Sequence, residues 1–535
     1  MGMVPWSLRR VLRANVAQTR FGTLTSRMTS ALLDTAPDAV VAQLRSRIGA
    51  PHVLTDATDL QFFSHDVVHA GPHRVVCVAR PGTIDELRAV VASCTSAAYS
   101  VVPRGGGASY TKGYLATTDT SVLVDTTRLA NIVAIDVDAM TVTVECGITW
   151  KALYDALRPL GVRTPFWGPM SGAFATVGGS LSNHAIIWGA VRYGVSGDSV
   201  LGLDVVQADG SLLTTGSCGT LGRTAFYRNH GPDLTGLFLG DAGALGIKAT
   251  ASLRLIRTPL AVSTASFTFA SHTALATASC ELARASVLSD CFGLDPVLRR
   301  QRTRRVAIEQ GAPATPESLN DVRYALHMGC EGRSDAAVAA DAVAVRDICR
   351  AHGGTEIDDV VPRSLRQHPW VTMTSAIGPA GERWAPLHGI VPLTDAVDAW
   401  NAIRSIVDEM KPSLDRLDIA VGTLTSLVST SAFVLEPVCY WHGAMSPYAE
   451  RIYSAEEKAR FTRFAPDAES DDVVATLRER LLACFDARGA AHLQLGKAYH
   501  FRETRSPEQW ALLTAIKRAL DPHGLMNPGA LGLSS

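Results

Sequence analysis

Apolar residues along the chain follow two spacings, and the change between them divides the chain in two. In the first part, short β-type runs such as Ser121–Val124 and Leu201–Ala208 are separated by turn residues. Helical periods lie between these runs, and Thr83 followed by Glu86 forms a capping-box pattern before an apolar-periodic helix that reaches Cys94. The pattern predicts an α+β domain with many short strands and no regular β-α-β alternation.

The pattern changes after Pro259. Residues 259–500 contain Ala-rich helical stretches such as Asp335–Ala351, placed between β-type runs such as Tyr324–Gly329 and Leu387–Pro392. Strand, helix and strand follow one another twice, which predicts an antiparallel sheet covered by helices on one face.

Composition and charge exclude several classes of protein. Hydrophobic residues make up 47% and charged residues 19% of the 535 residues, which is typical of a globular protein and not of a disordered one. Lys and Arg number 50 against 51 Asp and Glu, so no basic surface for a nucleic-acid partner is expected. The chain lacks a run of roughly 18–20 apolar residues, so no transmembrane segment is expected.

Two kinds of residue bear on the compartment. The ten cysteines form no Cys-x-x-Cys pair, so we expect reduced, mostly buried thiols and no zinc cage. The first 33 residues contain several Arg and no Asp or Glu, which fits a mitochondrial transit peptide. A frayed N-terminal extension of a bacterial protein fits the same residues, so both a mitochondrial and a cytoplasmic location agree with the sequence.

A glycine-rich loop follows the predicted strand Tyr99–Val102. Arg104-Gly105-Gly106-Gly107-Ala108-Ser109 combines three glycines, a cation and a hydroxyl group. A dinucleotide pyrophosphate is met by backbone N–H groups, and only glycine lets the backbone come close enough. An ordinary turn fits these residues too. The Rossmann fingerprint is absent, which disfavours a nicotinamide site.

Three further segments of small and hydroxyl residues follow within 145 residues. They are Thr176–Asn183, Arg192-Tyr193-Gly194 leading to Asp198, and Asp233–Phe238 running on into Gly246-Ile247. Together with the first loop they exceed what turns alone require.

The order of these segments resembles the FAD-binding domain of the vanillyl-alcohol oxidase/p-cresol methylhydroxylase superfamily. The resemblance rests on five stretches in register: 103–107, 175–183, 192–194, 233–238 and 521–529. It covers roughly residues 60–258 and 505–532.

The resemblance implies a bipartite PCMH-type FAD-binding domain with an inserted α/β cap domain that carries the substrate. The implied division is an N-terminal extension at 1–34, an FAD-binding domain at 35–258, a cap at 259–500 and a returning C-terminal segment at 501–535. The implied cofactor is FAD, and the residues expected to bind it are Pro103, Arg104, Gly105, Gly106, Gly107, Ala108, Ser109, Thr176, Gly178, Gly179, Asn183, Tyr193, Gly194, Gly246, Ile247 and Asn527.

Within the superfamily the chain shares features with two branches. Its C-terminal stretch and Gly496-Lys497 are similar to the D-lactate dehydrogenase/glycolate oxidase branch. The metal-binding His-x-Gly-Asp-Gly-Asn-x-His pattern of that branch is missing, so no metal is expected. Gly231-Pro232 and Asp198 resemble the phenol-oxidising branch instead.

Alcohol oxidation needs a base for the hydroxyl proton and an anchor for the rest of the substrate. If residues 436–442 form a strand, Glu436, Tyr440 and His442 share one face and form a wall of the site. Lys497 and Tyr499 alternate in the same way and suit an anion clamp. Both groups also fit structural roles, in a sheet core or on a solvated edge strand.

The predicted catalytic residues are therefore His442, Tyr440, Lys497, Tyr499 and Asp198. FAD is expected to be dissociable, since Ala108-Ser109-Tyr110 offers no His for covalent attachment. A cap His is the alternative, with His442 or His500 as the candidate.

The expected function is an FAD-dependent oxidoreductase that takes hydride from a small 2-hydroxy acid similar to D-lactate. Electrons would then pass to an external acceptor. Oxidation of a 4-hydroxybenzyl-type alcohol is one alternative, and a non-catalytic flavin-domain protein is another. The expected partners are the small substrate and the acceptor, and the sequence leaves a homo-oligomer open.

Overall fold

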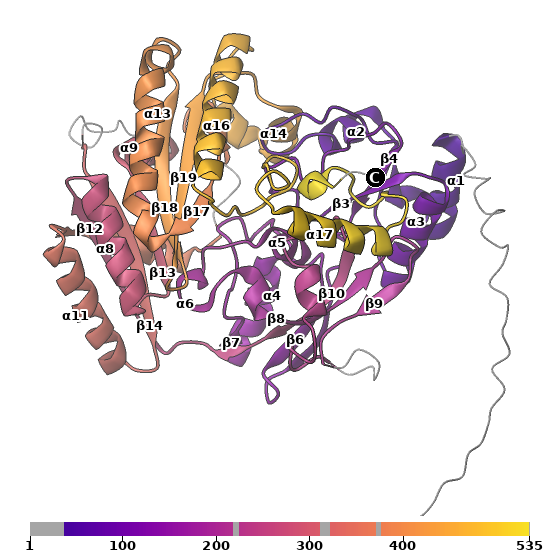
Figure 1. The fold of residues 1–535 in the computed structure, drawn as a ribbon, viewed down its shortest axis with the longest axis horizontal. Helices are drawn as coiled ribbons and strands as arrows, with labels where there is room; N and C mark the ends of the chain where they lie inside the picture. Colours follow the sequence, from indigo (N-terminus) through magenta and orange to yellow (C-terminus); the bar gives the residue numbers. More distant parts are fainter. Residues whose placement is uncertain (1–36, 218–223, 311–320, 371–375, 534–535) are drawn as a thin grey trace, which may run out of the picture.

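The structure, a computed structural model, describes residues 37–217, 224–310, 321–370 and 376–533. Residues 1–34, for which a transit peptide and a frayed extension both fit, lie outside the described residues. Figure 1 shows two parts side by side, each built on its own sheets. We call the elements α1 to β11 the N-terminal part and the elements β12 to α16 the cap; the division at 258/259 stays a prediction, and β11 ends at Arg257 while β12 begins at Ala261.

The described residues of the N-terminal part form a four-stranded sheet, a five-stranded sheet and a two-stranded ribbon. In the four-stranded sheet, β2, β4 and β3 are parallel and β1 is antiparallel, in the order β1(Val53–Leu54), β2(Cys77–Ala79), β4(Ser121–Asp125), β3(Ser100–Arg104). The five-stranded sheet is antiparallel, in the order β5(Ile132–Asp136), β6(Thr141–Glu145), β10(Ile247–Arg254), β8(Val200–Val206), β9(Leu212–Thr214). A two-stranded ribbon pairs β7(Val162–Arg163) with β11(Ile256–Arg257).

The helices of this part are short, and side chains cap several of them. They are α1(Pro37–Ile48), α2(Ala57–Phe63), α3(Ile84–Ser96), α4(Trp150–Leu157), α5(Val177–Asn183), α6(Ala190–Tyr193) and α7(Leu234–Leu237). Thr83 caps α3 as predicted, because its hydroxyl accepts the Glu86 N–H at 3.1 Å. The reciprocal bond is shifted by one residue, since the Glu86 carboxylate accepts the N–H of Gly82 at 2.7 Å.

The cap is an eight-stranded antiparallel sheet. Its order is β15(Thr355–Ile357), β12(Ala261–Phe269), β14(Tyr324–Gly332), β13(Asp290–Leu294), β18(Ala420–Val428), β19(Ala432–Trp441), β16(Arg383–Pro386), and β17(Gly389–Pro392) also pairs with β19. The predicted antiparallel sheet is confirmed.

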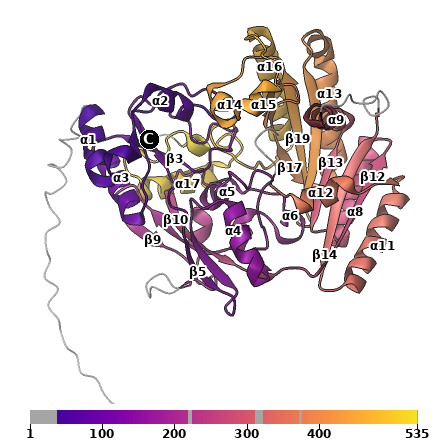
Figure 2. The ribbon, with the colours of Figure 1, turned by 180° about the vertical axis from the view of Figure 1, so that it is seen from behind.

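Helices cover both faces of the cap sheet, where the sequence predicted only one covered face. One face packs into a core with α8(His272–Ala285), α11(Asp335–Ala351), α13(Ala396–Arg416) and α16(Ala468–Ala487), which lie in front of the strands in Figure 1. On the other face lie α9(Pro296–Gln310) and α12(Val360–Gln367), seen from behind in Figure 2. Two short helices, α14(Pro447–Ile452) and α15(Ala455–Ala459), follow β19. Among the described residues, no helix is long and apolar enough to cross a membrane.

The C-terminal segment returns to the N-terminal part. Helix α17(Pro507–Leu520) lies against the N-terminal part in Figure 1. After it, Met526 forms a parallel bridge to Val101 of β3, and the Asn527 N–H donates to the Val101 carbonyl at 2.8 Å. The tail therefore extends the four-stranded sheet at its β3 edge.

Candidate active site

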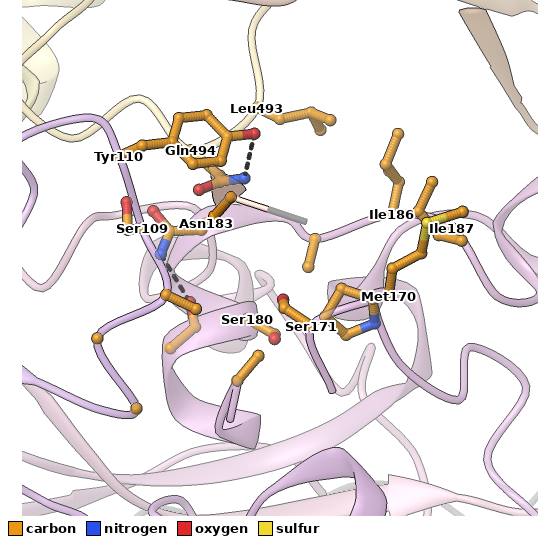
Figure 3. Close-up of a pocket in the computed structure, with 18 of the residues that line it drawn as sticks. Ser109, Tyr110, Met170, Ser171, Ser180, Asn183, Ile186, Ile187, Leu493 and Gln494 are labelled. Atoms are coloured by element: carbon orange, nitrogen blue, oxygen red, sulfur yellow. Dashed lines mark hydrogen bonds between the residues drawn. The ribbon is translucent and has the colours of Figure 1, made fainter. Parts of the chain in front are cut away.

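A cavity of about 760 Å³ lies between the N-terminal part and the cap. Such a volume is typical of small-molecule and cofactor sites. The N-terminal part supplies the loop 103–109, helix α5 and residues 246–248, while the cap supplies side chains from β13, β18, β19 and α9. Figure 3 shows Ser180 and Asn183 of α5 at this cavity, with Tyr110 and Gln494 across from them.

The glycine-rich loop packs closely on the segment before α5. A Cβ atom on Gly106 would lie 1.7 Å from the carbonyl oxygen of Phe174, and one on Gly105 would lie 2.2 Å from Thr176 Oγ1. Gly107 has a φ of +72°, in the left-handed region that favours glycine. The glycines are thus required by the protein's own packing, in addition to the approach of a ligand predicted from the sequence.

Helix α5 forms the second wall of the N-terminal side. Thr176 caps it by accepting the Gly179 N–H at 3.2 Å, and Asn183 donates to the Gly179 carbonyl at 2.9 Å (Figure 3). Gly178 faces Cys146, whose Cβ would lie 2.8 Å from a Cβ at 178. All predicted cofactor residues line the cavity except three, which are Tyr193, Gly194 and Asn527.

Two of those three belong to a turn outside the cavity lining. Gly194 ends α6 with a φ of +84°, and a Cβ there would lie 2.0 Å from Asp198 Oδ2. Asp198 is exposed and accepts the Val195 N–H at 2.8 Å, so it caps a short helical turn. The Arg163 guanidinium lies over the Tyr193 ring at 5.8 Å. Asp198 and Tyr193 therefore have structural contacts, and the structure gives Asp198 no place among the groups that line the cavity.

Asn527 lies behind the cavity wall. Its buried side-chain amide donates to the carbonyls of Gly113 at 2.9 Å and Ala242 at 2.6 Å. Gly113 and Ala242 both line the cavity. The tail residue thus ties two wall loops together without lining the cavity itself.

Arg104 is a buried cation at the cavity. Its side chain is 6% exposed, and its guanidinium lies over the rings of Phe63 at 4.7 Å and of Phe62 and Tyr114 at 5.3 Å each. Its Nε has no hydrogen-bond partner, and within the described residues no carboxylate forms an ion pair with it. A buried guanidinium without a counter-ion favours an anionic ligand.

On the cap side, the predicted strand over residues 436–442 is β19, which ends at Trp441. Glu436, Val438 and Tyr440 all line the cavity. Burial raises the pKa of the Glu436 carboxyl to about 7, and it also raises the pKa of the Tyr440 hydroxyl. A carboxyl group with a pKa near neutrality can exchange a proton with a substrate.

His442 does not follow its strand neighbours into the cavity, because β19 ends one residue before it. Its ring stacks on Phe464 at 4.3 Å, and its Nε2 lies 3.5 Å from the exposed Asp418 carboxylate. His500 also lies outside the lining, 2.8 Å from Asp486. The structure therefore places neither His at the cavity, which removes the geometric basis for covalent attachment through them.

Residues 492–500 form turns and no strand, so the predicted shared face of Lys497 and Tyr499 does not exist. Lys497 donates to the Leu115 carbonyl at 2.5 Å, outside the cavity lining, and burial lowers its pKa to about 7. Tyr499 is buried beneath His388: its hydroxyl accepts the His388 backbone N–H at 3.1 Å and lies 2.9 Å from His388 Nδ1. An anion clamp at Lys497 is therefore not supported.

His388 is a cavity residue that the sequence analysis missed. It follows β16, is 1% exposed and lines the cavity, and its Nε2 has no hydrogen-bond partner. Burial lowers its pKa to about 3, so the ring is neutral. Within the described residues the Tyr499 hydroxyl makes no hydrogen bond besides those to His388, and it already accepts the backbone N–H of that residue. We infer that the hydroxyl donates a hydrogen bond to Nδ1, which leaves the ring proton of the neutral imidazole on Nε2.

One face of helix α9 also lines the cavity and was missed. Leu298, Gln301, Arg302 and Arg305 recur at helical spacing along it. Arg305 donates to the Ile377 carbonyl at 2.5 Å, whereas Arg302 has no hydrogen bond or ion pair with any described residue. Arginines occur on all sides of this helix, so its sequence shows no apolar stripe from which the side facing the cavity could be predicted.

Within residues 37–217, 224–310, 321–370 and 376–533, no group of three or more His, Cys, Asp or Glu is arranged to hold a metal ion.

Comparison with known proteins identifies the N-terminal side of the cavity. The FAD binding domain family matches residues 75–216, and the C-terminal domain family of FAD linked oxidases matches residues 495–531. The chain is an FAD-linked oxidoreductase. The matched regions contain the glycine-rich loop, α5 and the Asn527 tail.

Relatives that match over most of their length, and a solved structure, are similar to the chain beyond the two matched regions. The chain is 25% identical over 505 residues to a D-2-hydroxyglutarate dehydrogenase of Xanthomonas citri, covering 92% of this chain and 97% of that one. It is 26% identical over 510 residues to a probable mitochondrial D-lactate dehydrogenase of Danio rerio, covering 92% of each. The solved structure of p-cresol methylhydroxylase superposes with a TM-score of 0.73 at 18% identity, over 93% of this chain and 97% of that one. The predicted PCMH-type fold is confirmed.

The cavity suits FAD, the cofactor of this oxidoreductase. On its N-terminal wall, the close-packed glycine loop and the Arg104 cation, which has no carboxylate partner among the described residues, would hold the phosphates, and backbone and small side chains of α5 would hold the ring system. The opposite wall is left to the cap, which presents Glu436, His388 and Arg302.

Proposed function

We propose that this oxidoreductase oxidises a D-2-hydroxy acid to the 2-oxo acid, and that the electrons then leave to an external acceptor. The observation that carries the proposal is the pairing, in one cavity, of the Glu436 carboxyl with a pKa near 7 and the unpaired Arg302 guanidinium. The names of the two full-length relatives, a D-2-hydroxyglutarate dehydrogenase and a probable D-lactate dehydrogenase, support the same substrate class.

Arg302 is suited to hold the substrate carboxylate. A guanidinium offers several donors in a plane, and those of Arg302 make no hydrogen bond or ion pair with a described residue; the Glu309 carboxylate of the same helix attracts this cation but does not bond to it. Arg305, one helical turn away on the same face, adds a second positive charge at the cavity. This role replaces the clamp predicted at Lys497.

Glu436 and His388 divide the proton chemistry. FAD, when bound, supplies the hydride acceptor for such an oxidation. Glu436 in its ionised form takes the proton of the substrate hydroxyl. His388 stays neutral and donates its Nε2–H to a substrate oxygen, and Tyr499 positions it by fixing the tautomer.

Anaerobic mixing of the flavin-loaded protein with candidate substrates tests the proposal. We expect D-2-hydroxy acids to bleach the flavin absorbance in a concentration-dependent way, and L-2-hydroxy acids to leave it unchanged. Arg302→Met should raise the Kd for the D-acid ten-fold or more, while Arg300→Met, on the same helix but outside the cavity lining, serves as the control. Absence of bleaching by every D-2-hydroxy acid refutes the proposal.

One observation favours oxidation of a 4-hydroxybenzyl-type alcohol as the second candidate. Tyr110 and Tyr440 both line the cavity, and the Tyr110 hydroxyl accepts a hydrogen bond from Gln494 at 3.1 Å, which leaves its proton free for a phenolate oxygen. Bleaching by a 4-hydroxybenzyl alcohol and not by D-2-hydroxy acids would select this function.

A further inference from the structure

A row of cavity-lining side chains crosses the cap sheet, beginning at Glu436. Leu424 of β18 is paired directly with Glu436, and Leu294 of β13 is paired directly with Leu424. All three line the cavity. Directly paired residues point to the same face, and neighbouring strands lie about 4.8 Å apart. An apolar surface therefore extends for about 10 Å from the Glu436 carboxyl across two strands.

The surface around this row is apolar too. Phe292 precedes Leu294 by two residues on β13, and Val438 follows Glu436 by two residues on β19. Both line the cavity and belong with Leu294 and Leu298 to one hydrophobic cluster. We call Phe292, Leu294, Leu298, Leu424 and Val438 the apolar patch.

Helix α9 places the apolar patch next to Arg302, the residue proposed to bind the substrate carboxylate. A Cβ on Gly422 would lie 2.7 Å from Leu298 Cγ, which shows that Leu298 packs directly on β18. Arg302 follows Leu298 by four residues, so both lie on the same face of the helix and line the same cavity. A carboxylate held by Arg302 and a hydroxyl held by Glu436 therefore leave the third substituent of the carbinol carbon at the patch.

The cofactor does not account for the patch. The residues suited to FAD belong to the opposite wall, in the loop 103–109 and α5. An apolar wall offers water no hydrogen-bond partners, so it is occupied most favourably by apolar groups.

We propose that the substrate is a D-2-hydroxy acid whose C2 substituent is a long alkyl or an aryl group, and that the apolar patch binds this substituent. The proposal rests on the proposed function and goes beyond it. It disfavours lactate, whose C2 substituent is only a methyl group, and it disfavours substrates whose C2 substituent carries a second carboxylate.

The test is a series of D-2-hydroxy acids from lactate through 2-hydroxyhexanoate, with 3-phenyllactate and 2-hydroxyglutarate, in anaerobic stopped-flow reduction. A fully buried methylene contributes about 0.8 kcal/mol, or about four-fold in affinity. The ratio of reduction rate to Kd should therefore rise about 60-fold from lactate to 2-hydroxyhexanoate, which has three more methylenes. A flat series, or a preference for 2-hydroxyglutarate, would overturn the proposal.

The Leu424→Gln variant tests whether the apolar patch causes the preference for long substituents. A polar side chain at the centre of the patch should reduce the preference for 2-hydroxyhexanoate over lactate at least ten-fold. Leu512→Gln, on a side chain that is 65% exposed on α17, should leave that preference at its wild-type value. An unchanged preference in a folded Leu424→Gln protein would contradict the role of the patch.

A binding measurement separates this proposal from the proposed function. Unsubstituted carboxylic acids from propionate to hexanoate, and 3-phenylpropionate, carry the carboxylate and the apolar chain but no hydroxyl group. They are titrated against the wild-type holoprotein, with binding followed by perturbation of the flavin spectrum. If no D-2-hydroxy acid bleaches the flavin while affinity for these acids rises with chain length, the proposed function fails and the apolar subsite stands. If bleaching occurs with no dependence on chain length, the proposed function stands and the subsite is refuted.

Discussion

Replacement of Glu436 by Gln separates the proton acceptor from the rest of the site. The pKa of this carboxyl is raised to about 7 by burial. Its ionised fraction therefore rises from about one tenth at pH 6 to about nine tenths at pH 8. If the ionised form takes the substrate proton, the rate of flavin reduction in the wild type should rise about ten-fold across this interval.

The variant cannot accept the proton, because an amide has no basic form in this range. We expect Glu436→Gln to slow flavin reduction about 10²–10⁴-fold and to remove the rise between pH 6 and pH 8. The assay is single-turnover reduction with a saturating D-2-hydroxy acid at pH 5.5–9. Glu503→Gln, an exposed carboxyl near His500, is the matched control and should keep the wild-type profile.

The same substitution has a consequence for stability whose sign is fixed. The folded pKa of about 7 lies above the ordinary value of 4.5, so between these values the folded protein holds a proton that the unfolded chain has released. The free energy of unfolding therefore falls as pH rises from 4.5 to 7, by about 3 kcal/mol at most. Gln stays neutral, so Glu436→Gln should gain stability relative to the wild type at pH 8 and not at pH 4.5, as measured by denaturant unfolding.

Two results would refute this reasoning. A wild-type reduction rate that is constant between pH 6 and pH 8, with Glu436→Gln reducing at the same rate, excludes Glu436 as the proton acceptor. Equal changes in unfolding free energy at pH 4.5 and pH 8 exclude the raised pKa.

Three other substitutions test the supports of the site. Gly106→Ala places a Cβ 1.7 Å from the Phe174 carbonyl oxygen and must displace the loop, so we expect the FAD content of the purified protein, read from its absorbance, to fall below a tenth per chain; full occupancy would contradict the packing. Asn527→Ala leaves two carbonyls without their donor and should cost about 2 kcal/mol of unfolding free energy by denaturant titration, and a loss below 0.5 kcal/mol would rule out the tie. Tyr499→Phe removes the hydrogen bond that fixes the His388 tautomer and should weaken D-2-hydroxy acid binding several-fold with an altered pH profile. An unchanged Kd at every pH would show that this hydrogen bond does not position His388 for the substrate.

The N-terminal wall of the site could be predicted from the sequence because its parts are local. The stretch 103–109 is a single loop, and Thr176–Asn183 is a capped helix, so residues adjacent in the chain are adjacent in space. Asp198 and Gly194 were predicted at the site but lie outside the cavity lining, since a helix-ending glycine and a capping acid leave the same sequence pattern as a cofactor turn.

The cap wall could not be predicted, because register and element ends decide it. Leu294, Leu424 and Glu436 meet only through the pairing of three strands that are more than 100 residues apart at their extremes. Period two placed Tyr440 correctly and failed at His442, because β19 ends at Trp441. No strand forms around Lys497, so the same period has no meaning there.

The bridge between Val101 and Met526 has a consequence for biosynthesis. Asn527 fastens the Gly113 loop 414 residues after that loop has been made, and the intervening chain includes the whole cap. A nascent chain that has not yet released residue 527 from the ribosome has the glycine loop and α5 but not the tie behind them. The wall loops of the cavity are therefore held in their final arrangement only late in synthesis, after the cap has been made.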